Sequence, residues 1–236
     1  MSLPYYVSPE QVMKDRAEYA RKGIQRGRSV IVARYRDGIV MIADNPSQSL
    51  KKIGEIYDRI AFAAVGRYHE FEQLRMEGIR YADLRGYAYD RRDVTAQGLA
   101  NHYAQRLGYA FSSSIDKPFE VELVVAEIAD SCEDDRIFTI GFDGTITDEA
   151  DLAIIGGQSH LWRDYLSENY RPQMDLNQLI ATVSSLMGQR SCLEIACLDR
   201  TMKKRRRFRR ISSQTIDDIL TGSVVFDESS PDGSQR

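Results

Sequence analysis

Few residues of this chain have the types and spacing that a reaction centre requires. The three histidines, His69, His102 and His160, are scattered, and none is spaced with a carboxylate as in a zinc-binding helix. The chain has no GxSxG nucleophile motif, no phosphate loop and no dinucleotide fingerprint. Its three cysteines form no CxxC pair, which fits a reducing cytoplasm. We therefore predict no metal and no cofactor.

Two charged runs are the other candidates for chemistry. Glu133, Asp134 and Asp135 follow Cys132 in a predicted hairpin turn, where we expect a solvated loop. The run KKRRRFRR (203–210) holds seven basic residues, but outside it 25 basic residues face 35 acidic ones. Because a phosphate-tracking surface needs a wider basic face, we expect an exposed hairpin edge and no nucleic-acid partner. A basic hairpin that binds nucleic acid stays open as one alternative function.

The elements that must position any such residues begin with a helix over residues 8–29. Ser8 is a good N-cap, Pro9 fits the first helical position, and Gln11 stands where a capping box needs it. Apolar residues follow at spacings of three and four along one face. This helix either packs on its own domain or meets other subunits.

The remaining pattern predicts blocks of strands separated by pairs of helices. Strands are expected at 29–44 (a hairpin turning at Asp37-Gly38), 60–66, 119–129, 136–149 (turning at Asp143-Gly144), 152–157, 192–200 and 206–212. Helices are expected from about 68, at 94–111, 160–170, 175–188 and 213–220. Several strands are apolar on both faces. The predicted fold class is therefore α+β: a four-layer αββα sandwich of two antiparallel sheets flanked by helices, with an extra N-terminal helix.

Length and composition indicate a single domain over residues 8–226, followed by a disordered acidic tail at 227–236. The start MSLPYYVSPE has neither a basic beginning nor an apolar run, so we expect no signal peptide. No segment approaches eighteen consecutive apolar residues, so we expect no membrane partner.

Several motifs resemble those of one known family. The sandwich with the segments SVIVARYRDGIVMIAD (29–44) and SLKKIGEIYDRIAFAAVG (49–66) resembles the proteasome-type N-terminal-nucleophile hydrolases. SPEQ (8–11), Glu18-Tyr19-Ala20 and RGYAYDRRDVTAQGLANHYAQ (85–105) resemble the α-type subunits of the 20S proteasome, in their actinobacterial form. The resemblance covers about residues 4 to 221.

The resemblance implies a non-catalytic chain. Active β-type subunits of this family use a Thr at the start of the first strand as nucleophile, with its own free amine as base. Here Arg28-Ser29 stands at that position and a capped helix precedes it. Lys52 and Asp44 match the family's lysine and acid, which would be remnants without the nucleophile. An amidohydrolase that uses Ser29 after processing stays open as the alternative.

The resemblance also implies partners. Seven α-type subunits would form a ring, two such rings would cap two β-type heptamers, and a hexameric AAA ATPase would deliver unfolded proteins to them. Residues 1–7 would project toward the pore, and the gate would comprise Pro4, Tyr5, Tyr6, Val7, Ser8 and Pro9. The Tyr-Asp-Arg cluster of archaeal and eukaryotic gates is absent before Ser8.

A docking pocket follows from the same resemblance. Lys52 would lie between adjacent α-type subunits and bind the C-terminal carboxylate of the activator ATPase. Arg26 and Gly66 match other positions of that pocket, and Glu18 matches a helix carboxylate near the lysine. Without the resemblance, Lys52 would be interpreted as an ordinary surface lysine.

Overall fold

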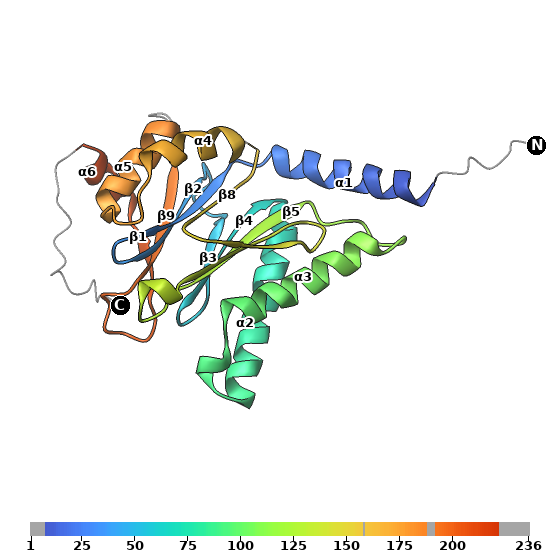
Figure 1. The fold of residues 1–236 in the computed structure, drawn as a ribbon, viewed down its shortest axis with the longest axis horizontal. Helices are drawn as coiled ribbons and strands as arrows, with labels where there is room; N and C mark the ends of the chain where they lie inside the picture. Colours follow the sequence, from blue (N-terminus) through green and yellow to red (C-terminus); the bar gives the residue numbers. More distant parts are fainter. Residues whose placement is uncertain (1–7, 158, 188–191, 222–236) are drawn as a thin grey trace, which may run out of the picture.

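A computed structural model describes residues 8–157, 159–187 and 192–221, and it contains two stacked five-stranded antiparallel sheets (Figure 1). The first sheet has the strand order β10 (Phe208–Ile211), β9 (Leu193–Asp199), β2 (Gly38–Asp44), β1 (Val30–Tyr35) and β8 (Leu152–Ile155). The second has the order β3 (Ile53–Tyr57), β4 (Ile60–Gly66), β5 (Val121–Glu127), β6 (Arg136–Ile140) and β7 (Ile146–Glu149).

Helices cover both outer faces of the sandwich. The second sheet is covered by α2 (Tyr68–Ala88) and α3 (Ala96–Ser112), and the first by α4 (Ser159–Asn169), α5 (Leu176–Met187) and α6 (Ser213–Leu220). A leading helix, α1 (Pro9–Gln25), extends away from this body, and short 3-10 helices span Arg91–Asp93 and Cys132–Asp134.

Strand alternation builds the layers. In β1, Val30 and Val32 enter the core between the two sheets, whereas Ile31 and Ala33 pack toward α4 and α5. Strands in both sheets are buried on both faces, as a central position requires. The predicted αββα sandwich with an extra N-terminal helix is therefore confirmed.

The β1–β2 hairpin turns one residue earlier than the sequence predicted. Its turn residues are Arg36 and Asp37, and Gly38 already pairs with Tyr35 as the first residue of β2. Glycine is needed at position 38 because a Cβ there would lie 2.0 Å from the carbonyl oxygen of Leu198 in β9. Close strand packing, not turn conformation, therefore explains this glycine. The turn predicted at Asp143-Gly144 is confirmed, with φ +85° at Gly144.

The predicted start of α1 is correct, but its capping box is only half formed. Ser8 Oγ accepts a hydrogen bond from Gln11 N (3.2 Å), and Pro9 occupies the first helical turn. The Gln11 side chain instead donates to Asp15 Oδ1 (2.7 Å), a charge-assisted partner one turn ahead. Val7, predicted to form a hydrophobic staple, lies outside the described residues.

Only the second half of α1 packs on the body. Arg16 donates to three carbonyl oxygens at and beyond the end of α3, and Ala20 and Ile24 are buried. Val12 and Met13 are 41% and 37% exposed, although they belong to the apolar side of the helix. The first half of α1 projects from the body (Figure 1), and its apolar side chains Val12 and Met13 are therefore in contact with solvent.

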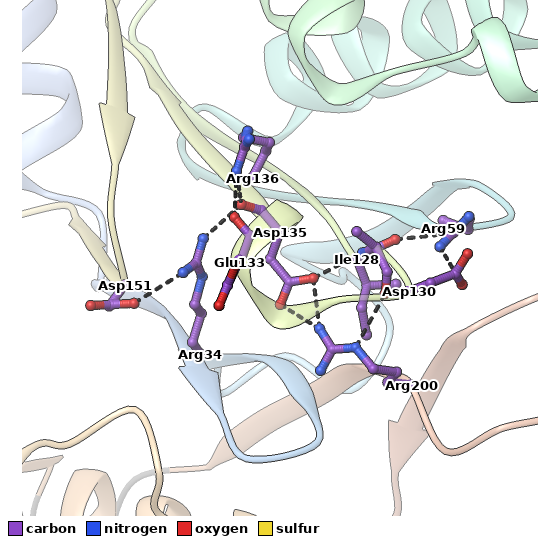
Figure 2. A network of polar contacts seen from close by, with 10 residues as sticks. Arg34, Arg59, Ile128, Asp130, Glu133, Asp135, Arg136, Asp151 and Arg200 are labelled. Carbon is purple, nitrogen blue, oxygen red and sulfur yellow. Dashed lines mark hydrogen bonds and ion pairs between the residues drawn. The ribbon is translucent and has the colours of Figure 1, made fainter.

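The acidic run after Cys132 is not the fully solvated loop that the sequence suggested. Glu133 and Asp134 are exposed, but Asp135 is 1% exposed and pairs with Arg200 through both carboxylate oxygens, each at 2.7 Å (Figure 2). Arg34 in β1 donates to the Asp135 carbonyl (2.6 Å). Asp135 directly precedes β6 of the second sheet, whereas Arg34 lies in β1 and Arg200 directly follows β9 of the first, so this network joins the two sheets.

The basic run 203–210 forms an edge hairpin, as predicted, but much of its charge is paired within the chain. Arg206 binds the Glu55 carboxylate of β3 (2.8 and 2.7 Å), and Arg210 binds Glu194 (2.8 Å). Arg209 pairs with Asp199 (3.0 Å). The Arg209 and Arg210 pairs join β10 to β9 within the first sheet, whereas Arg206, just before β10, reaches β3 at the edge of the second sheet.

Candidate functional site

The candidate site lies where the chain passes from α1 into β1. Lys52 stands just before β3, and its ammonium nitrogen donates to the main-chain carbonyls of Arg28 (2.7 Å) and Asp44 (3.0 Å). Both carbonyls belong to the β1–β2 hairpin, one just before its first strand and one at the end of its second. The lysine therefore fixes the start of β1 from within its own subunit.

The surroundings of Lys52 change its acidity. Burial is the main effect and lowers the pKa of the ammonium to about 8, from an ordinary value of 10.5. The negative charges of Asp44 and Glu194 oppose this shift, whereas the positive charge of Arg28 adds to it. Lys52 is consequently a half-buried cation and not the ordinary surface lysine that the sequence alone suggested.

The acid and the serine at the start of the hairpin are both bound within the chain. Arg28 Nη1 binds both carboxylate oxygens of Asp44 (2.9 and 3.0 Å), so this acid is paired with an arginine. Ser29 is 3% exposed, and its carbonyl accepts a hydrogen bond from Asp44 N (3.3 Å). The nitrogen of Ser29 belongs to the peptide bond with Arg28, and through Arg28 the chain continues back to α1. It is therefore not a free amine.

Gly66 lies against the same connection. It ends β4 with φ +124°, and a Cβ there would lie 1.9 Å from the Glu120 carbonyl oxygen. A Cβ on the neighbouring Gly27 would lie 3.3 Å from Gly66 N. Gly66 therefore lies against Gly27, and Lys52 binds the carbonyl of the next residue, Arg28; that they line one pocket stays a prediction.

The other two pocket candidates are less closely associated. Arg26 is the exposed C-cap of α1, immediately before Gly27. Glu18 lies two turns earlier on α1 and pairs with Lys22 (2.6 Å), which lowers the pKa of its carboxyl. Within the chain, neither Arg26 nor Glu18 has a described hydrogen bond or ion pair with Lys52. Of the gate residues, Ser8 and Pro9 begin α1, and Pro4, Tyr5, Tyr6 and Val7 lie outside the described residues.

Sequence reasoning missed the group that holds the Lys52 segment. Glu194 in β9 accepts from the main-chain nitrogen of Lys52 (2.9 Å) and from the side chain of Asn45 (2.7 Å). Glu194 is 142 residues from Lys52 in sequence, and no local pattern announces the contact. Only the pairing register of β9 with β2 could have predicted this contact, because it places Glu194 opposite the end of β2.

The histidines of the described residues do not belong to a metal site. Among them, no group of three or more His, Cys, Asp or Glu side chains could hold a metal ion. His102 stacks on Tyr81 with ring centroids 4.8 Å apart, while His69 and His160 are exposed. In the same part of the chain, every helix is too short or too polar to span a bilayer.

Comparison with known proteins gives a consistent assignment. The family model described as proteasome subunit matches residues 24–191. Proteins named proteasome subunit alpha are similar over almost the whole chain. One from Nocardioides sp. is 51% identical, covering 93% of this chain and 90% of its own length; one from Streptomyces scabiei is 50% identical, covering 98% of both. One from Thermomonospora curvata is 52% identical, covering 93% of this chain and 98% of its own. This chain therefore belongs to the proteasome subunit family, as an α-type member of the actinobacterial form.

Proposed function

We propose that this chain is a non-catalytic α-ring subunit of a bacterial 20S proteasome core. It scaffolds the β-type rings, gates the entry of unfolded proteins, and docks a ring-shaped ATPase. The observation that carries the non-catalytic assignment is the hydrogen bond from Lys52 to the carbonyl of Arg28. An N-terminal nucleophile needs a free amine at the start of the strand, and here that position is occupied by folded chain.

Exposed side chains support the scaffolding role. Besides Val12 and Met13 on α1, the end of α2 and the segment after it expose Leu84, Tyr87 and Tyr89 at 71%, 92% and 76%. Arginines flank these residues, and Tyr and Arg are enriched where protein interfaces are buried. The projecting half of α1 and the end of α2 lie in different parts of the molecule (Figure 1). Two such surfaces suit a subunit with ring neighbours and a second ring beneath.

The Lys52 geometry supports the docking role. Two of the three ammonium protons point to main-chain carbonyls, which leaves one donor for an incoming group. A C-terminal carboxylate is a matching ligand, because a charge-assisted hydrogen bond forms with a partly desolvated cation. The adjacent Lys51 is exposed, so it is the matched control.

The deciding experiment compares Lys52→Ala with Lys51→Ala in particles assembled with the β-type partner. Lys52→Ala should raise the ATPase concentration needed for half-maximal protein degradation about tenfold or more, because a charge-assisted contact contributes ~1.5–3 kcal/mol. Cleavage of short peptides and the Lys51→Ala particle should be unchanged. Equal stimulation of Lys52→Ala and wild type would reject the docking site.

The rival function, an amidohydrolase that uses Ser29, is tested by mass. A purified chain that retains residues 2–28 and does not cleave peptides without β-type partners supports the scaffold assignment. A processed product beginning at Ser29, with peptidase activity of its own, would overturn it.

A further inference from the structure

A single buried carboxylate gathers four hydrogen-bond donors beside the candidate docking site. Glu194 has a side chain that is 5% exposed, and its Oε2 accepts from Lys52 N (2.9 Å) and Asn45 Nδ2 (2.7 Å). Its Oε1 accepts from Ile53 N (3.3 Å) and Arg210 Nη1 (2.8 Å). Each oxygen therefore has two donors, which satisfies the carboxylate in a buried position.

Three of these donors come from one short connection, the segment 45–53 between β2 and β3. Asn45 lies at its start, and Lys52 and Ile53 lie at its end, so one carboxylate holds the two ends together. Asn45 also donates to the Leu50 carbonyl (2.7 Å), and its main-chain nitrogen donates to the Cys192 carbonyl (2.8 Å). The connection is therefore held by the Glu194 carboxylate of β9 and by the Cys192 carbonyl just before that strand.

This fixation determines where the Lys52 ammonium can lie. The Lys52 main chain is fixed by Glu194, and its ammonium is fixed by the Arg28 and Asp44 carbonyls. A ligand gains most from a cation that is already oriented, because less side-chain entropy is lost on binding. Arg210 reinforces the arrangement by donating also to the Ile53 carbonyl (2.5 Å).

We propose that Glu194 is the positioning residue of the Lys52 docking site: it holds the 45–53 connection so that the ammonium is presented to an incoming carboxylate. This inference rests on the proposed docking role of Lys52. Glu194 itself does not touch the ligand, and it acts through the Lys52 main chain.

The test uses Glu194→Gln, which keeps the side-chain shape but offers one acceptor oxygen to four donors. The control is Glu55→Gln. Glu55 in β3 also pairs with an arginine of the basic run, Arg206, but it has no described hydrogen bond or ion pair with segment 45–53. Particles containing each variant and the β-type partner are compared with wild type.

Two measurements are made on these particles. Hydrogen exchange followed by mass spectrometry reports the protection of segment 45–53, and titration with the activator ATPase reports the concentration for half-maximal protein degradation. We expect Glu194→Gln to speed exchange in that segment and to raise the half-maximal concentration about tenfold. The maximal stimulated rate and basal peptide cleavage should stay within about twofold. Glu55→Gln should match wild type in both measurements.

A general loss of folding would lower basal peptide cleavage and the maximal rate, which distinguishes it from a positioning effect. If Glu194→Gln does not assemble, Asn45→Ala replaces it, because it removes one Glu194 contact and leaves the Glu194–Arg210 pair. It should raise the half-maximal concentration several-fold. If the half-maximal concentration is unchanged in the assembled variant but raised by Lys52→Ala, only the role of Glu194 is overturned. If Lys52→Ala is also without effect, docking and positioning are both rejected.

Discussion

The ammonium of Lys52 lies 2.7 Å from the main-chain carbonyl oxygen of Arg28, the residue that precedes the buried Ser29. Lys52 is therefore bound to the main chain immediately before β1 of its own subunit. Its remaining proton and its charge are available for recognition. This contact connects the proposed docking site to the segment between α1 and β1.

Docking at Lys52 should depend on pH in a range where an ordinary lysine would not titrate. Burial lowers the pKa of the ammonium to about 8, so its charge is lost as the pH rises through that value. Between pH 7 and pH 9 the half-maximal ATPase concentration should therefore rise about tenfold. Degradation is titrated at each pH, and the ATPase activity of the ring alone is measured in parallel.

The control for this pH dependence is Lys52→Arg. Arginine keeps its charge throughout this range, so particles that still dock the ATPase should give a flat profile. A flat profile for the wild-type particle would instead show that Lys52 titrates at its ordinary value or does not contact the ATPase.

Breaking the Asp135–Arg200 pair should destabilise the sandwich. Asp135→Asn leaves the Arg200 guanidinium without its carboxylate and should lower the free energy of unfolding by about 3 kcal/mol. For a chain of this size the melting temperature should fall by about 6–12 °C. Calorimetry on the isolated subunit at fixed concentration measures the change.

The matched control is Asp130→Asn, whose partner is Arg59 in the same region (Figure 2). The Asp130 side chain is 86% exposed, so its removal should cost less than about 1 kcal/mol. Similar melting temperatures for the two variants would contradict the inter-sheet role of Asp135.

Arg16 should anchor α1 to the body. It donates to the carbonyls of Ala110 (2.8 Å), Phe111 (3.0 Å) and Asp116 (2.7 Å). Arg16→Met keeps the apolar stem but removes these bonds, and it should lower stability by about 1–3 kcal/mol. Limited proteolysis within residues 9–25 should become faster. Lys14→Met, which removes only an exposed pair with Glu10, should leave the cleavage rate unchanged.

Deleting residues 2–7 should speed the entry of short fluorogenic peptides into the assembled particle. Ser8 caps α1 at its projecting end, so these residues are attached to the part of the helix that does not pack on the sandwich. Hydrolysis by the β-type subunits should rise several-fold, whereas deleting residues 227–236 should have no effect. An equal rate with and without residues 2–7 would indicate that they do not close the pore.

Local chemistry in the sequence was sufficient for much of the fold. Two-residue alternation fixed the faces of β1, and capping residues placed the start of α1, because such signals act between near neighbours. The replacement of the family's catalytic Thr by Arg28-Ser29 could also be recognised from sequence. The turn at Gly38 was misplaced, since a glycine required by a neighbouring strand looks the same as one required by a turn.

The partners of the charged side chains were decided only by the tertiary structure. Glu194 contacts Lys52 although the two are 142 residues apart in sequence, and Asp135 contacts Arg200 at a separation of 65 residues. The order of the strands in the sheets brings these positions together. An ion pair between distant residues leaves no periodic pattern, and its burial depends on which strands become neighbours. The sequence thus determined which side chains were present, and the stacking of the two sheets determined which of them lost contact with water.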